Sequence, residues 1–109
     1  MVDLPSAGSD APVTSPDPIT DIFSAVTRQT QSGQVLSVNN GVTVMDAVKA
    51  WTLSAAYSCF REDVLGTITA GKLADLVLLD KDPLAMPTEE LKKVKVIMTI
   101  LGGRVVWES

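Results

Sequence analysis

The stretch AGSDAPV, residues 7–13, contains Asp10, the carboxylate in this sequence whose neighbours most suggest a functional position. Asp10 lies between small residues and is followed at once by Pro12 and a proline-rich connection. Carboxylates are among the side chains that move protons in hydrolytic sites, so the residue is a candidate for catalysis. A second interpretation stays open, in which Asp10 is an exposed aspartate in a Ser-Asp turn.

The chain contains no histidine, which removes several kinds of catalytic site. Ser-His-Asp and Cys-His arrangements and two-histidine zinc sites all need imidazole. The single cysteine, Cys59, is a poor nucleophile candidate by itself, and we expect it to pack as a small apolar side chain. Hydrolytic chemistry would therefore have to come from carboxylates, from lysine or from another chain.

Composition narrows the class of protein further. A length of 109 residues with 46% hydrophobic and 20% charged residues is typical of one globular unit. The net charge of −4 makes nucleic acid an unfavourable partner. No apolar run approaches the ~20 residues that cross a bilayer, so no membrane association is expected. The amino-terminal MVDLPSAG has no secretory pattern, and we expect a cytoplasmic protein.

The first helix is predicted to begin at Asp17 and Pro18. An aspartate can accept hydrogen bonds from the free N–H groups of a first turn, and proline suits the first helical position. Apolar residues then recur at helical spacing until the pattern ends near residues 28–33. They are Ile19, Ile22, Phe23 and Val26.

A second helix is predicted over residues 43–58, after turn-forming residues at 39–41. Thr43 and Asp46 have the spacing of a capping box, with aspartate in place of glutamate. The apolar residues that follow define one broad face, which we expect to be buried. They are Val44, Ala47, Val48, Trp51 and Ala55.

The residues after Phe60 predict antiparallel strands. Strands are expected at 75–79, 95–101 and 104–108, the last two joined by a hairpin at Gly102 and Gly103. Thr67 to Thr69 is a short β-branched run before a turn at 70–71, and 88–93 forms at most two helical turns. We expect Asp75 to hold the turn at 71–74 through backbone amides.

One glycine-rich segment matches a phosphate-binding loop in part. GTITAGKL, residues 66–73, has the glycines and the lysine of such a loop, but Leu73 replaces the hydroxyl residue that would bind magnesium. The segment also leads into a predicted strand, whereas a phosphate-binding loop opens a helix. We therefore interpret it as a turn with a solvated Lys72.

Five segments taken in order resemble the carboxy-terminal end of metal-dependent amidohydrolases of family 3, similar to imidazolonepropionase and formamide deformylase. They are AGSDAPV, DPITDIFSAVTRQ, VTVMDAVKAWTLSAAYS, EDVLGTITAGKLADLVLLDKDP and VIMTILGGRVVWE. The resemblance covers nearly the whole chain. It implies an α+β chain with two amino-terminal helices from the end of a TIM-barrel-type domain, followed by antiparallel strands of a partial composite β-sandwich.

The same resemblance implies a division of the chain and a role for one residue. Residues 1–60 would be the remnant of the last barrel strand with its helices, and residues 61–109 the carboxy-terminal strands of the sandwich. In such enzymes the aspartate of the GSD segment faces or ligates zinc or another divalent metal and takes a proton from the attacking water. Asp10 matches that catalytic position, which fits active sites at the carboxyl ends of barrel strands.

The family's histidine ligands and the other barrel strands are missing from these residues, so no cofactor is expected in this chain alone. Two functions follow. In the first, the chain is part of a hydrolase of non-peptide carbon–nitrogen bonds and is inactive alone. In the second, it is a non-catalytic oligomerisation or interaction module. Strand edges without partners predict a homodimer or higher oligomer.

Overall fold

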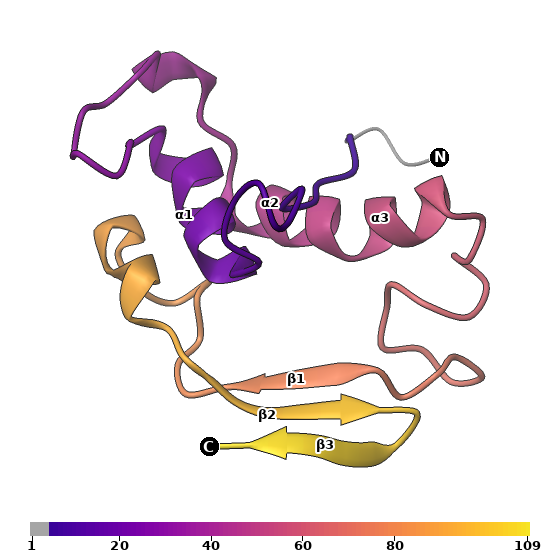
Figure 1. The fold of residues 1–109 in the computed structure, drawn as a ribbon. Coiled ribbons are helices and arrows are strands. Elements are labelled where there is room, and N and C mark those ends of the chain that lie inside the picture. The colour runs from indigo at the N-terminus through magenta and orange to yellow at the C-terminus, as the bar shows by residue number, and fades with distance from the viewer. Residues whose placement is uncertain (1–4) are drawn as a thin grey trace.

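The computed structural model describes residues 5–109, so the first four residues of the MVDLPSAG segment lie outside it. The chain is α+β, with helices in one layer and an antiparallel sheet in another (Figure 1). The elements in chain order are α1 (Pro18–Thr27), η1 (Val38–Asn40), α2 (Val44–Trp51), α3 (Leu53–Ser58), β1 (Leu76–Leu79), η2 (Thr88–Lys93), β2 (Val96–Leu101) and β3 (Arg104–Glu108). In this part of the chain, no helix has both the length and the apolar character needed to cross a membrane.

Helix α1 begins as predicted, because its first turn is capped by a carboxylate. Asp17 accepts a hydrogen bond from the Ile19 amide at 3.1 Å and another from the Thr20 hydroxyl at 2.7 Å. Pro18 occupies the first helical position. The helix ends at Arg28, whose left-handed conformation (φ 57°) lets its amide donate to the Ser24 carbonyl. The predicted start and end are therefore confirmed.

The prediction of one continuous helix over residues 43–58 was wrong. Its start is confirmed, since the Thr43 hydroxyl accepts from the Asp46 amide at 3.1 Å. The chain then breaks at Thr52, whose backbone leaves the helical region (φ −118°, ψ −83°), and α2 and α3 follow one another as separate helices. The Thr52 hydroxyl donates to the Val48 carbonyl at 2.8 Å, a local bond that competes with regular helix and bends it.

The sheet has the order β1-β2-β3, with both pairs antiparallel. Gly102 and Gly103 have φ values of 56° and 80°, which only glycine adopts readily, and they close the predicted hairpin. The β-branched run at residues 67–69 forms no strand. The Thr67 and Thr69 hydroxyls instead bond to each other at 2.9 Å within a loop.

Aspartates at both ends of β1 tie that strand to β2 and its hairpin. The Asp75 carboxylate accepts from the Gly102 amide at 2.8 Å, 27 residues away in sequence, and the Asp80 carboxylate accepts from the Lys95 amide at 2.7 Å. The expectation that Asp75 holds the turn at 71–74 was wrong. A partner so distant in sequence becomes available only after the hairpin has folded against β1.

The buried core lies among the helices and not in the sheet. The hydrophobic side chains that are buried are Phe23, Ala47, Ala56, Leu91 and Val94. Helix α1 packs against η2 and α2, and the Lys92 ammonium lies 4.5 Å from the centre of the Phe23 ring. No residue of the three strands is fully buried. Helix packing around Phe23 is therefore the main source of apolar stabilisation within this chain.

The chain exposes more surface than a closed domain of its size. Its accessible area is 7674 Å², whereas a compact monomer of 11.6 kDa is expected to expose about 5,800 Å². Side chains such as Val77 (58% exposed), Val105 (53%) and Trp107 (49%) on β1 and β3 contribute to the excess. The excess of about 1,900 Å² is comparable to one partner's share of a large protein interface.

Gly41, just before α2, predicts a clear stability effect. A Cβ atom added there would lie 2.5 Å from the Val26 carbonyl oxygen, a backbone atom that cannot move aside easily. We expect Gly41→Ala to lower the free energy of unfolding by about 1–3 kcal/mol, as overpacking does in cores. Gly8→Ala is the matched control, because a Cβ at Gly8 meets nothing within 4 Å. Equal denaturation midpoints for the two variants would contradict the prediction.

Candidate functional site

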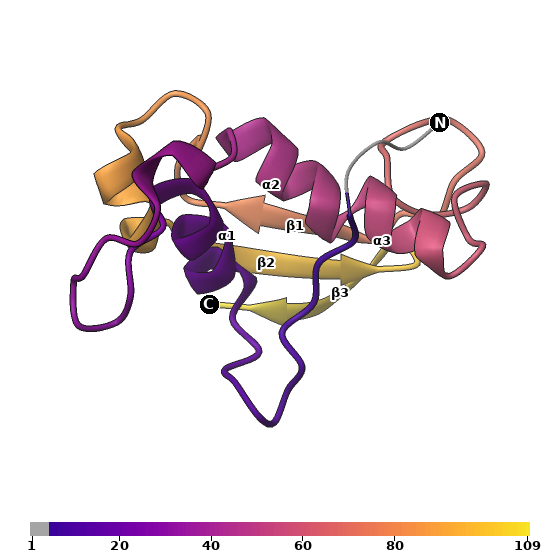
Figure 2. The same ribbon diagram turned by 90° about the horizontal axis from the view of Figure 1, so that it is seen from above.

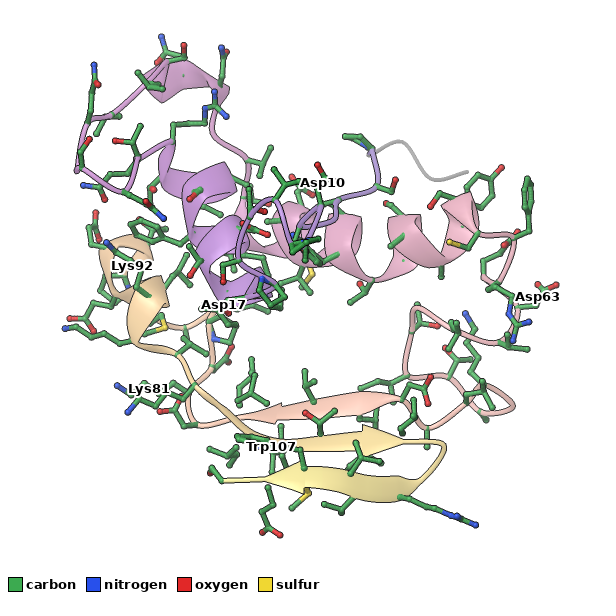
Figure 3. The ribbon with its side chains drawn as sticks, in the orientation of Figure 1. Asp10, Asp17, Asp63, Lys81, Lys92 and Trp107 are labelled. Carbon is green, nitrogen blue, oxygen red and sulfur yellow. The ribbon has the colours of Figure 1, made fainter. Side chains whose placement is uncertain are left out.

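Asp10 lies in the loop that precedes α1. Figure 2 shows this indigo loop projecting outward from the rest of the molecule. It is joined to the helical layer where the Ala7 amide donates to the Ala50 carbonyl of α2 at 3.0 Å. Figure 3 places Asp10 beside the helices, whereas Trp107 belongs to the sheet on the other side of the molecule. The Asp10 loop is therefore attached to the helical layer and not to the sheet.

The backbone around Asp10 forms a compact turn. Asp10 has a φ of 53°, in the left-handed region, and its carbonyl accepts from the Val13 amide at 2.9 Å. The Ser9 hydroxyl accepts from the Ala11 amide at 3.2 Å, and the Thr14 hydroxyl donates to the Ser9 carbonyl. The carboxylate is exposed to solvent. Both sequence interpretations of Asp10 agree with this geometry, since an exposed turn can also present a functional group.

The residues near Asp10 do not form a metal site. Among residues 5–109 there is no group of three or more histidine, cysteine, aspartate or glutamate side chains that could hold an ion. A catalytic zinc generally takes three protein ligands and a water, so one exposed carboxylate does not fit such an ion. Any metal that acted here would need ligands from outside residues 5–109.

A second feature, missed by the sequence analysis, is an apolar groove of about 600 Å³ between the helices and the start of β1. Its walls include Val48, Trp51 and Ala55 on one side and Leu73, Leu76 and Val77 on the other. Of the helix face predicted to be buried, Ala47 is buried as expected, whereas Val48, Trp51 and Ala55 line this open groove. The breadth of that apolar face was the sequence signal that could have pointed to the groove.

Cys59 and Lys72 also differ from expectation. Cys59 is exposed and lies in the wall of the groove, so the prediction that it packs as a small apolar side chain was wrong. The turn before Lys72 is confirmed, with the Lys72 amide donating to the Thr69 carbonyl at 3.1 Å. The Lys72 ammonium is not simply solvated, because it donates to the Leu65 carbonyl at 3.2 Å.

Comparison with known proteins identifies the family. The model of the amidohydrolase family matches residues 3–107. The chain is 34% identical to N-substituted formamide deformylase of Arthrobacter pascens over 94% of its length, and 32% identical to the putative amidohydrolase YtcJ of Bacillus subtilis over 97%. These matches cover 19% and 21% of the two relatives, so the chain spans about a fifth of their length.

Comparison with solved structures agrees with the family found from the sequence. An amidohydrolase from Thermotoga maritima superposes with a TM-score of 0.66 over 92% of this chain and 22% of its own, at 22% sequence identity. The resemblance read from the five ordered segments is therefore confirmed. The chain belongs to the amidohydrolase family.

Proposed function

We propose that this chain is the carboxy-terminal part of a metal-dependent hydrolase that acts on carbon–nitrogen bonds other than peptide bonds. The observation that carries the proposal is the family match over residues 3–107, which includes the Asp10 turn. The likeness to a formamide deformylase supports a substrate with an amide-type bond. In this proposal residues 1–60 come from the end of the barrel, and residues 61–109 belong to a composite sandwich.

Asp10 is the residue of this chain proposed to act in the reaction. Its exposed carboxylate is free to accept a proton from a water molecule that attacks the substrate carbonyl. Zinc or another divalent metal of the family would have to be held by ligands outside these residues, because one carboxylate does not fit it. The chain alone therefore lacks most of the site, and we expect it to be inactive.

The test compares this chain alone with a longer polypeptide that supplies the remaining barrel strands and their histidines. Both are assayed with added zinc for hydrolysis of N-acyl, formamide and cyclic amide substrates. We expect turnover from the longer polypeptide and none above the blank from the chain alone. Turnover by the 109 residues alone would contradict the assignment of the missing ligands, and its absence from both would contradict the hydrolase proposal.

A second candidate function is a non-catalytic module that assembles copies of the chain. The observation that favours it is the exposure of large hydrophobic side chains such as Val77 and Val105 on β1 and β3, which lie at the two edges of the sheet. Exposed edge strands pair readily with strands of another chain. The presence of one cysteine, with no internal partner, agrees with a cytoplasmic location for either function.

Assembly makes a separate prediction. We expect the chain to sediment as a homodimer or higher oligomer, at a multiple of 11.6 kDa. Val77→Lys, in the middle of β1, introduces a charge of the kind that protects edge strands and should shift the mass toward the monomer. Val13→Lys is the matched control, because Val13 is 78% exposed in the loop before α1. A monomeric wild type at micromolar concentration would contradict assembly.

A further inference from the structure

We propose that Ser9 and Thr14 are positioning residues that hold Asp10 in the orientation its reaction needs. The inference rests on the proposed function of Asp10 as proton acceptor and extends it to two residues that have no assigned role. It is carried by three observations: the backbone conformation of Asp10, the hydrogen bonds that surround it, and the absence of buried packing on its exposed side chain.

The conformation of Asp10 needs support. A left-handed backbone at a residue with a Cβ costs about 1–2 kcal/mol, although aspartate tolerates it better than most residues. Asp10 has a φ of 53° and is exposed, as are Ala11, Pro12 and Val13 after it. Packing against a core therefore cannot hold the backbone in this state. Local hydrogen bonds must do so.

Those bonds come from the residues on either side. Ser9 contributes twice, because its hydroxyl accepts from the Ala11 amide at 3.2 Å and its carbonyl accepts from the Thr14 hydroxyl. The Val13 amide closes the turn on the Asp10 carbonyl at 2.9 Å. The Thr14 side chain thus links the end of the turn to the residue before Asp10. We expect removal of that hydroxyl to loosen the turn while leaving the carboxylate group itself unaltered.

Orientation matters because a proton acceptor works only within hydrogen-bonding reach of the proton it takes. A displacement of about 1 Å can cost roughly 10²-fold in rate.

The first test measures the turn in this chain by NMR. A positive φ brings the amide and α protons of Asp10 close together and gives a strong intraresidue cross-peak. We expect Thr14→Val, which removes the hydroxyl at constant shape, to weaken that cross-peak, and Thr14→Ser to preserve it. Signals from α1 should be the same in both variants. An unchanged Asp10 cross-peak in Thr14→Val would overturn the inference.

The second test measures turnover in the longer polypeptide described above. Thr14→Val should lower kcat about 10- to 100-fold with KM within about twofold, and Thr14→Ser should restore most of kcat. Asp10→Asn in the same protein separates the two proposals. If Asp10→Asn leaves kcat unchanged, the proposed function of Asp10 fails. If it abolishes turnover while Thr14→Val has wild-type kcat, only the positioning role fails.

Discussion

Phe23→Ala is expected to lower the free energy of unfolding by about 3–5 kcal/mol, the range for removing a buried aromatic side chain. Phe23 is 3% exposed and sits where α1 packs against η2. Its ring also lies under the Lys92 ammonium at 4.5 Å, a contact that adds to the loss. Because few other hydrophobic side chains are fully buried, the remaining helices have little core with which to compensate.

The chain contains a matched control for this experiment. Phe60 is 90% exposed, so Phe60→Ala makes the same chemical change without opening a cavity. We expect it to shift the free energy of unfolding by no more than about 0.5 kcal/mol. Urea denaturation followed by circular dichroism at one protein concentration compares the two variants. Similar losses in the free energy of unfolding for the two variants would contradict the placement of Phe23 in the helical core.

The second large effect is expected on catalysis. In the longer polypeptide, Asp10→Asn should lower kcat about 10²- to 10⁴-fold, the contribution typical of a positioned acid or base. Asparagine keeps the size of the side chain and also tolerates the left-handed backbone, so the turn should survive. The exposed position of Asp10 predicts an unfolding free energy close to that of the wild type. The loss should therefore be confined to turnover.

The control for charge alone is Asp63→Asn. Asp63 is an exposed aspartate in the loop after α3 and lies apart from Asp10 in Figure 3. Its substitution changes the net charge by the same amount and should leave kcat within about twofold. A comparable loss of kcat in both variants would point to a general electrostatic effect, and full activity in Asp10→Asn would remove Asp10 from the mechanism.

We propose one physical explanation for the large accessible area of the chain and for the isolated position of Asp10. The chain spans about a fifth of the length of its relatives, exposes about 30% more area than a compact monomer, and carries the exposed Asp10 on a projecting loop. We propose that the open apolar groove and Asp10 both belong to larger arrangements, which the rest of such a protein would complete. We therefore expect that supplying the remaining barrel strands will stabilise the sheet and complete the site together.

Local chemistry in the sequence was enough to predict several features of this protein. The Asp17–Pro18 start of α1 and the Gly102–Gly103 hairpin were confirmed, because capping bonds and glycine turns depend on residues only a few positions apart. The order of five segments along the chain also predicted the amidohydrolase family, which the comparisons confirm. The same segments singled out Asp10 as a candidate, and its catalytic role stays a prediction.

Tertiary structure decided what depends on residues far apart in the sequence or on the exact backbone. The Asp75 carboxylate bonds to Gly102 across 27 residues, and no local pattern predicts such a partner. The break at Thr52, the groove beside Cys59 and the left-handed Asp10 turn likewise became visible only in three dimensions. In each case several conformations of similar local energy compete, and the choice depends on which distant groups or which few hydrogen bonds the fold brings together.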